Sequence, residues 1–278
     1  MTHHANQPVA NHLAHDPASY GDSFADVYDE WYSSLDDDDF VESFARHLPE
    51  TSARILELGA GTGRLLEKLH SLRRNRHDAM VGIDASDKML DVARTRGVGR
   101  IAELVLGDFS GELPAGPFDA IFVGYNTLFN LPDEASIASC LSHVATSLAP
   151  HGYFMTDLVI PVMTETNEHS TIRTMANGDT VVSVSRVEPT TRTISGYFGH
   201  LVDGVETVRR PWNVHYLAPE ELDALAVHAG LTLVERTADG NGSAFSADAS
   251  RHISRYVLSS STSELSVAPL KRPFRDLS

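Results

Sequence analysis

The sequence predicts an α/β protein built on a doubly wound, mostly parallel sheet, with an antiparallel β insert. Two observations predict the sheet: short apolar strands alternate with helices between residues 55 and 158, and the first strand runs directly into a Gly-rich turn. A third observation predicts the insert: after Pro161 the chain changes to runs rich in Val, Thr, Ile and Tyr. In a doubly wound sheet the ligand lies at the carboxyl ends of the strands.

Composition limits the classes of function. With 278 residues, of which 42% are hydrophobic, the chain can bury one large α/β domain without needing a second one. A net charge of −16 repels polyanions, so we do not expect nucleic acid as a substrate. The basic run Arg73, Arg74 and Arg76 is interpreted as the charged end of a helix.

Cysteine usage and hydropathy indicate the compartment. Cys140 is the only cysteine in the sequence, which fits a reducing environment. No apolar run approaches the length of a membrane span and the first residues are polar, so we expect a cytoplasmic protein without signal peptide or anchor. The early histidines His3, His4, His12 and His15 lack partners at ligand spacing, so no metal site is expected.

The N-terminal part precedes the sheet. Residues 1–19 are expected to form a flexible leader. Apolar and aromatic residues then recur at helical spacing from Tyr20 to Trp31, which predicts a helix with one aromatic face that lies over the core. The acidic run Asp36 to Asp39 is interpreted as a solvated turn and helix start, rather than as a metal site.

The cofactor-binding core is expected to span residues 20–160. Helices are predicted after the first strand (Leu65 to Leu72), after the second strand (from Ser86) and at Ile137 to Leu148. The predicted strands are Ile55 to Leu58, Met80 to Ile83, Glu103 to Leu106, Phe118 to Val123 and Tyr153 to Leu158.

The insert is expected to span residues 161–217 and to lie on the substrate side. It contains the predicted strands Thr180 to Val187, Thr193 to Val202 and Val205 to Tyr216, with a hairpin turn at Asp203-Gly204. Residues 218–258 complete the core with a helix that opens at Ala218-Pro219 and with the strands Leu231 to Glu235 and Ser254 to Leu258. Residues 259–278 are expected to form a flexible tail.

The Gly-rich turn predicts a nucleotide-type ligand. Gly59, Gly61 and Gly63 let the backbone approach a ligand closely, which is a weak signal when taken alone. Their spacing differs from that of dinucleotide-binding turns, which disfavours a nicotinamide oxidoreductase. Glu57 at the strand end repels a pyrophosphate and suits a ligand that carries an amine and a sulfonium.

Two further acids follow at the ends of the next strands. Asp84 lies 21 residues after Gly63, where a carboxylate can accept two ribose hydroxyls. Asp108, in the sequence Gly107-Asp108-Phe109, offers a carboxylate for an exocyclic amine beside an aromatic ring. Each acid alone is more often an ordinary strand-end or capping residue. Three acids in order at successive strand ends favour an adenosine ligand.

The segments ILELGAGTGRLLEKL, GIDASDKML, VLGDFS and FDAIFVGYNTLFNL resemble those of the class I S-adenosylmethionine-dependent methyltransferases. The resemblance extends from about Tyr20 to Leu258, and it implies a Rossmann-like seven-stranded sheet with S-adenosyl-L-methionine as cofactor. The cofactor-binding residues it implies are Tyr20, Tyr28, Glu57, Gly59, Ala60, Gly61, Thr62, Asp84, Ala85, Met89, Gly107, Asp108, Phe109, Tyr125 and Asn126.

The resemblance also implies roles within that set. Glu57 and the turn from Gly59 to Gly61 line the methionine part, and Asp84 binds the ribose. Asp108 with the backbone of Phe109 holds the adenine, and the Tyr125-Asn126 corner faces the sulfonium.

The segment SYGDSFADVYDEWY and the insert ending in WNVHYLAPEELDALAVHAGLTLVE resemble the amino-sugar N-methyltransferases of natural-product pathways. Those enzymes keep a tyrosine at the position of Tyr20, but they carry a histidine where this chain has Asn130. Asparagine can orient an acceptor by hydrogen bonds but cannot take a proton. This departure favours methylation of an amine nitrogen or an electron-rich aromatic carbon, as in an indole, over methylation of a sugar hydroxyl.

The acceptor is expected to be a soluble small molecule. Its binding residues are predicted to be Trp31, Asn130, Tyr197, Trp212 and His215. Tyr20, Asn130 and His215 are the candidate catalytic residues, with His215 as the best remaining base, although a structural role for this histidine is the more common case.

Three alternatives stay open at this point: a non-catalytic regulatory protein that binds S-adenosylmethionine, a small-molecule O-methyltransferase, and, with less support, a nicotinamide oxidoreductase. No membrane partner is expected, and a homodimer is compatible with the sequence.

Overall fold

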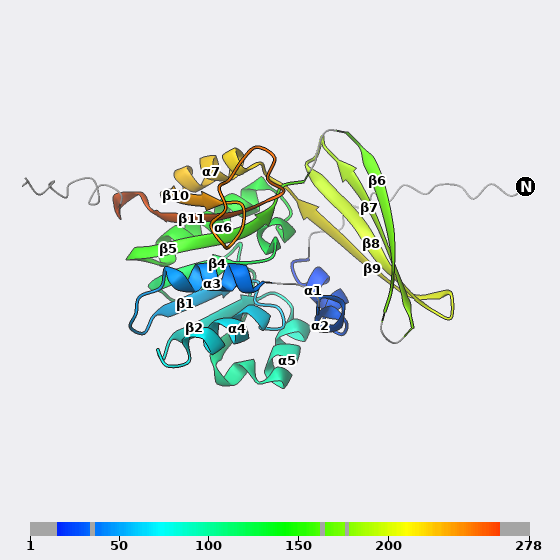
Figure 1. The fold of residues 1–278 in the computed structure, drawn as a ribbon, viewed down its shortest axis with the longest axis horizontal. Coiled ribbons are helices and arrows are strands. Elements are labelled where there is room, and N and C mark those ends of the chain that lie inside the picture. The colour runs from blue at the N-terminus through cyan, green and yellow to red at the C-terminus, as the bar shows by residue number, and fades with distance from the viewer. Residues whose placement is uncertain (1–15, 34–36, 162–164, 176–177, 262–278) are drawn as a thin grey trace, which may run out of the picture.

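The computed structural model describes residues 16–33, 37–161, 165–175 and 178–261, so the expected leader up to residue 15 and the tail from residue 262 lie outside the described part. A seven-stranded sheet with helices on both faces forms the core, and a four-stranded antiparallel sheet stands beside it (Figure 1). No helix of the described residues is long and apolar enough to cross a membrane.

The central sheet has the strand order β10-β11-β5-β4-β1-β2-β3. Only β11 runs against its neighbours, so the sheet is mostly parallel, as predicted. The strand order reverses between β1 and β4, and the crevice at such a reversal is where open α/β sheets bind ligands. The strands are β1 (Arg54–Leu58), β2 (Ala79–Asp84), β3 (Ala102–Leu106), β4 (Phe118–Val123), β5 (Leu148–Val159), β10 (Leu231–Thr237) and β11 (Arg251–Leu258).

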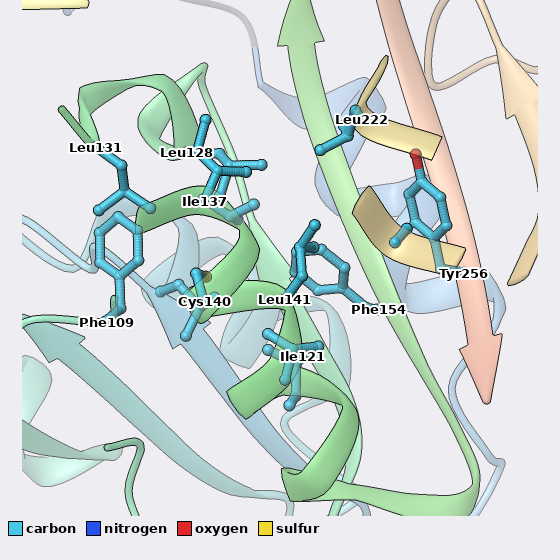
Figure 2. Close-up of a cluster of buried hydrophobic side chains, with 14 of the residues drawn as sticks. Phe109, Ile121, Leu128, Leu131, Ile137, Cys140, Leu141, Phe154, Leu222 and Tyr256 are labelled. Atoms are coloured by element: carbon cyan, nitrogen blue, oxygen red, sulfur yellow. The ribbon is translucent and has the colours of Figure 1, made fainter. Parts of the chain in front are cut away.

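Helices cover both faces because the central strands are apolar on both. Ile55 packs with α3, α4 and α5, whereas its neighbour Leu56 packs with α6 and α7. Figure 2 shows the second cluster, in which Leu141 of α6 and Leu222 of α7 lie near Phe154 of β5. The helices are α3 (Asp38–Arg46), α4 (Arg64–Arg73), α5 (Asp87–Arg96), α6 (Glu134–Ser147) and α7 (Pro219–His228), with short 3₁₀ turns at Val98–Arg100 and Thr127–Asn130.

The predicted N-terminal helix is divided into two, α1 (Ser19–Phe24) and α2 (Tyr28–Trp31), so the prediction of one helix from Tyr20 to Trp31 is wrong. In an uninterrupted helix the Val27 N–H would bond to the Ser23 carbonyl. Here Arg210 of β9 donates to that carbonyl, and the Val27 N–H bonds to Phe24 instead. We call residues 19–31 the lid.

The acidic run is only partly solvated. Helix α3 begins at Asp38 as expected, but Asp37 is 3% exposed and forms an ion pair with Arg64. Asp39 forms an ion pair with Arg251 of β11. The solvated-turn prediction is therefore wrong for Asp37, because this residue pairs with Arg64, which lies 27 residues further along the chain. Asp36 lies outside the described residues.

The insert sheet has the order β6-β7-β8-β9, with strands β6 (Asn167–Thr174), β7 (Thr180–Glu188), β8 (Thr193–Val202) and β9 (Val205–His215). The last three were predicted, and β6 was not. One face of this sheet covers the lid, where Phe198 lies with ring centroids 5.7 Å from both Phe24 and Trp31. The insert therefore touches the core partly through the lid (Figure 1).

Candidate functional site

Two adjoining cavities lie at the carboxyl ends of β1, β2 and β4, beneath the lid. The outer cavity has a volume of about 140 Å³ and the inner one about 30 Å³, and they share Tyr28, Gly59, Gly61 and Thr127. A larger open groove of about 710 Å³ between α3, α4 and the end of α5 contains none of the predicted site residues. We place the site at the two smaller cavities because the strand ends converge there.

Most of the predicted cofactor residues line these cavities. Those around the outer cavity are Tyr20, Tyr28, Gly59, Gly61, Asp84, Ala85, Met89, Asp108 and Phe109. Those around the inner cavity are Tyr28, Glu57, Gly59, Ala60, Gly61, Thr62 and Tyr125. Gly107 and Asn126 line neither cavity.

The glycine turn is held by the neighbouring strand. The Gly61 N–H donates to Oδ2 of Asp84 at 2.8 Å, and Gly61 has a φ of +54°, which favours glycine. A Cβ added at Gly61 would meet nothing within 4 Å, whereas one added at Gly63 would collide with Val98. The Gly61 backbone thus borders open space that a ligand can fill.

Asp84 supports this turn and faces the outer cavity. Its Oδ1 accepts the Ser86 N–H at 2.8 Å while Oδ2 accepts that of Gly61. A carboxylate offers about four lone-pair positions, so two remain for ligand hydroxyls. Burial raises the pKa of Asp84, which the two backbone hydrogen bonds partly offset.

Glu57 at the end of β1 is 2% exposed, and its Oε2 has no hydrogen-bond partner among the described residues. Burial, and then the negative charge of Asp84, raises the pKa of Glu57 well above its usual range. An unpaired buried carboxylate is costly, so the position calls for a cationic or hydrogen-bond-donating ligand group.

Arg64 provides the opposite charge at the same cavity and was not predicted. It forms an ion pair with Asp37, and its guanidinium lies 5.4 Å from the centre of the Tyr125 ring. Its Nε is buried without a partner in the described part of the chain. Glu57 and Arg64 thus both line the inner cavity, and each has one buried atom without a partner, a carboxylate oxygen and a guanidinium N–H. Groups of these two kinds match the ammonium and the carboxylate of an amino acid.

At the end of β3, where the adenine was predicted to bind, the Asp108 carboxylate already accepts hydrogen bonds within the protein. Asp108 accepts hydrogen bonds from the Ser110 N–H and hydroxyl, both at 2.8 Å. The buried Phe109 ring lies against Gly59. Gly107 donates to the Asp84 carbonyl at 2.9 Å, so it fixes the strand ends relative to each other and does not line the cavity.

Tyrosines from the lid cover the site. Tyr20 stacks on Phe24 with ring centroids 4.5 Å apart, and its hydroxyl lies 3.4 Å from that of Tyr32. Burial raises the pKa of Tyr20, and it raises that of Tyr125 to about 12. These phenols are therefore neutral at physiological pH and can donate hydrogen bonds.

Of the residues predicted to bind the acceptor, Asn130 and Trp212 line the outer cavity, beside Pro211 and Asn213, which were not predicted. The Trp212 indole Nε1 is buried without a hydrogen-bond partner among the described residues.

Three predicted acceptor residues lie away from the cavities. Trp31, the last residue of the lid, is buried against Phe198 of the insert. Tyr197 lines neither cavity, and the Arg209 guanidinium carbon lies 4.1 Å from the centre of its ring. His215 ends β9 opposite Thr193, and burial, followed by the charge of Arg192, lowers its pKa.

Asn126 is engaged elsewhere. Its amide donates to the Tyr216 hydroxyl and accepts the Val159 N–H, each at 3.3 Å, which ties the corner after β4 to β5 and to the residue that follows β9. Tyr125 and Asn126 have φ of +57° and +63°, so this corner is strained. Within the described residues, no group of three or more His, Cys, Asp or Glu is placed to hold a metal ion.

Comparison with known proteins connects this site to a family. Residues 55–152, which contain β2 to β4, the glycine turn and all of β1 except its first residue, match the model of a methyltransferase domain. The chain is 28% identical over 147 residues to the cypemycin N-terminal methyltransferase of a Streptomyces species, a match that covers 52% of this chain and 58% of that enzyme. The chain thus aligns with little more than half of that curated relative.

Solved structures resemble the whole fold. The CcbJ methyltransferase from Streptomyces caelestis is 29% identical, with a TM-score of 0.78 over 88% of this chain and 99% of that one. CalS10 from Micromonospora echinaspora, described as an amino pentose methyltransferase with S-adenosylmethionine bound, is 20% identical, with a TM-score of 0.65 over 91% of this chain and 99% of that one. The predicted Rossmann-like class I methyltransferase fold is thereby confirmed.

Proposed function

We propose that this chain, an S-adenosylmethionine-dependent methyltransferase, methylates an amine nitrogen of a soluble small molecule. The observation that carries the cofactor part of the proposal is the inner cavity, which is lined by Glu57 and Arg64, each with one buried unpaired atom. These two groups suit the amino-acid end of S-adenosylmethionine, and Asp84 has acceptor positions left for its ribose hydroxyls.

The remaining cofactor residues follow from the same placement. Asp108 and Phe109 are proposed to hold the adenine at the far end of the outer cavity, with Ala85 and Met89 beside it. When bound, the cofactor supplies an electrophilic methyl group on a sulfonium. The lid then excludes water and positions the acceptor, because Tyr20 and Tyr28 lie over the outer cavity.

The chemistry of the acceptor side favours nitrogen. Asn130 can hold an acceptor but cannot remove its proton, and His215 does not line the cavity. An amine that arrives neutral needs no strong base, whereas an alcohol does. The cypemycin relative is named for an N-terminal, and thus amine, acceptor. An electron-rich aromatic carbon is the second candidate, because the Trp212 ring forms one wall of the outer cavity.

The test is the release of S-adenosylhomocysteine with matched acceptors: amino sugars, the same sugars with hydroxyl in place of the amine, and indoles. We expect turnover with amines, at a rate that rises with pH as the amine loses its proton. Turnover with the hydroxyl sugars alone would indicate O-methylation, and turnover with indoles alone would indicate carbon methylation. Tight binding of S-adenosylmethionine without turnover of any acceptor would favour the regulatory alternative.

A further inference from the structure

Arg210 lies on β9, directly before the cavity residues Pro211 and Trp212, but its side chain points to the lid. Its guanidinium donates two parallel hydrogen bonds to the Asp26 carboxylate, both at 2.9 Å, and a third to the Ser23 carbonyl. The same group lies 5.6 Å from the centre of the Trp31 ring. The Arg210 side chain is 8% exposed, whereas that of Asp26 is 67% exposed, so a buried guanidinium is paired with a carboxylate at the surface of the lid.

The lid is held by three carboxylates that face three different parts of the molecule. Asp22 accepts the Ser86 hydroxyl at the start of α5, at 2.7 Å. Asp29 accepts the Thr62 hydroxyl of the glycine turn at 2.7 Å and pairs with Arg96. Asp26 alone among these three pairs with the insert, through Arg210.

We propose that Arg210 is a positioning residue that joins the lid to the insert, so that the two walls of the outer cavity keep one fixed separation. Tyr20 and Tyr28 form the wall on the lid, whereas Trp212 and Asn213 form the wall on β9. The bidentate fork fixes both distance and orientation, which a single flexible cation does not. This inference rests on the proposed methyl transfer.

The effect falls on the chemical step. Asp84 and the glycine turn are proposed to bind the cofactor, and they are held by hydrogen bonds from the Gly61 and Ser86 N–H groups to the Asp84 carboxylate, which do not involve Arg210. An acceptor held between two walls that shift by about 1 Å loses its alignment with the methyl group, which costs about a hundredfold in rate. Arg210 therefore governs kcat more than cofactor affinity.

The first measurement needs no acceptor. Asp26→Ala removes both carboxylate bonds and leaves Arg210 in place, and Glu206→Ala is the matched control, because Glu206 pairs with Arg209 of the same strand away from the lid. Amide hydrogen exchange should become at least about threefold faster in residues 19–31 and 205–215 of Asp26→Ala. It should stay unchanged there in the control. Faster exchange in the lid alone would overturn the link to the insert.

The second measurement uses an acceptor found in the panel. Asp26→Ala should lower kcat by about ten- to a hundredfold, with the dissociation constant of S-adenosylhomocysteine within about threefold of wild type. Arg210→Lys keeps the positive charge but cannot form the two parallel hydrogen bonds to Asp26. It should also lower kcat while leaving the dissociation constant of S-adenosylhomocysteine nearly unchanged. Wild-type kcat in Asp26→Ala would overturn the positioning role. If no acceptor is turned over by the wild type, the proposed function fails, and the exchange measurement still decides whether the lid and the insert are coupled.

Discussion

Replacing Glu57 by Gln should weaken binding of S-adenosylhomocysteine, which carries the same amino-acid end as S-adenosylmethionine. Glu57 is 2% exposed and its Oε2 is unpaired, so it is the group that a ligand ammonium would satisfy. Glutamine keeps the shape and removes the charge. A hydrogen bond to a charged group contributes about 1.5 to 3 kcal/mol, so the dissociation constant should rise by about ten- to a hundredfold.

The pH dependence follows from the raised pKa of Glu57. Between the ordinary and the raised pKa, the folded protein keeps a proton that the unfolded chain has lost, so the free energy of unfolding falls as pH rises. A ligand ammonium needs the ionised carboxylate, so wild-type affinity should rise with pH over the same range. Glu57→Gln should abolish this slope and stabilise the unliganded protein at neutral pH.

Calorimetric titration of S-adenosylhomocysteine between about pH 5.5 and about pH 7.5 measures the loss of affinity in Glu57→Gln and the pH dependence of wild-type affinity. The ligand amine stays largely protonated in this range. Glu103→Gln is the control, since Glu103 is an exposed glutamate on β3, which is separated from β1 by β2. If Glu57→Gln binds as tightly as wild type at every pH, the carboxylate does not meet the ligand ammonium and the placement of the amino-acid end is wrong.

Four further outcomes are expected. Gly61→Val should abolish S-adenosylhomocysteine binding in calorimetry, because the branched side chain enters the open space beside the turn; normal binding by the folded variant would refute this. Asp84→Ala should weaken the same binding at least about tenfold, since it removes ribose acceptors and the support of the Gly61 N–H; unchanged affinity would exclude the ribose role. Tyr20→Phe should lower turnover by about ten- to a hundredfold with little change in cofactor affinity, and wild-type turnover would remove Tyr20 from the reaction. Burial lowers the pKa of His252 from 6.5 to about 4, so about 3 kcal/mol of stability should be lost as pH falls through this range; chemical denaturation of His252→Phe should show a smaller loss, and an equal loss would assign the effect to other groups.

The sequence predicted the central sheet because its strands are buried on both faces and therefore read as continuous apolar runs. β4 and β8 have the predicted bounds. β6 was missed because every residue in it is exposed, so its sequence carries no apolar alternation. The break between α1 and α2 was missed because the group that bonds to the Ser23 carbonyl there is Arg210, which lies far away in the chain.

The candidate site was predictable where it follows from topology. Parallel strands bring successive strand ends to one edge, which is why Glu57 and Asp84 were found together. Arg64 stands directly after the last glycine of the turn, and this adjacency was the signal available for it. Asn213 was not predictable, because its approach to the cavity depends on how the insert is placed beside the core.

The glycine turn on one side of the cavities and the lid on the other are held by different kinds of interaction. The N–H groups of Gly59 and Ala60 bond to the Ile83 carbonyl at 2.8 and 3.0 Å, so the turn is ordered before any ligand arrives and loses little entropy on binding. The lid is held in place in part by ion pairs at the surface, such as that between Asp29 and Arg96. Dissolved salt screens such pairs and leaves backbone bonds intact. Raising the ionic strength should therefore speed the entry and escape of ligands more than it weakens their equilibrium binding.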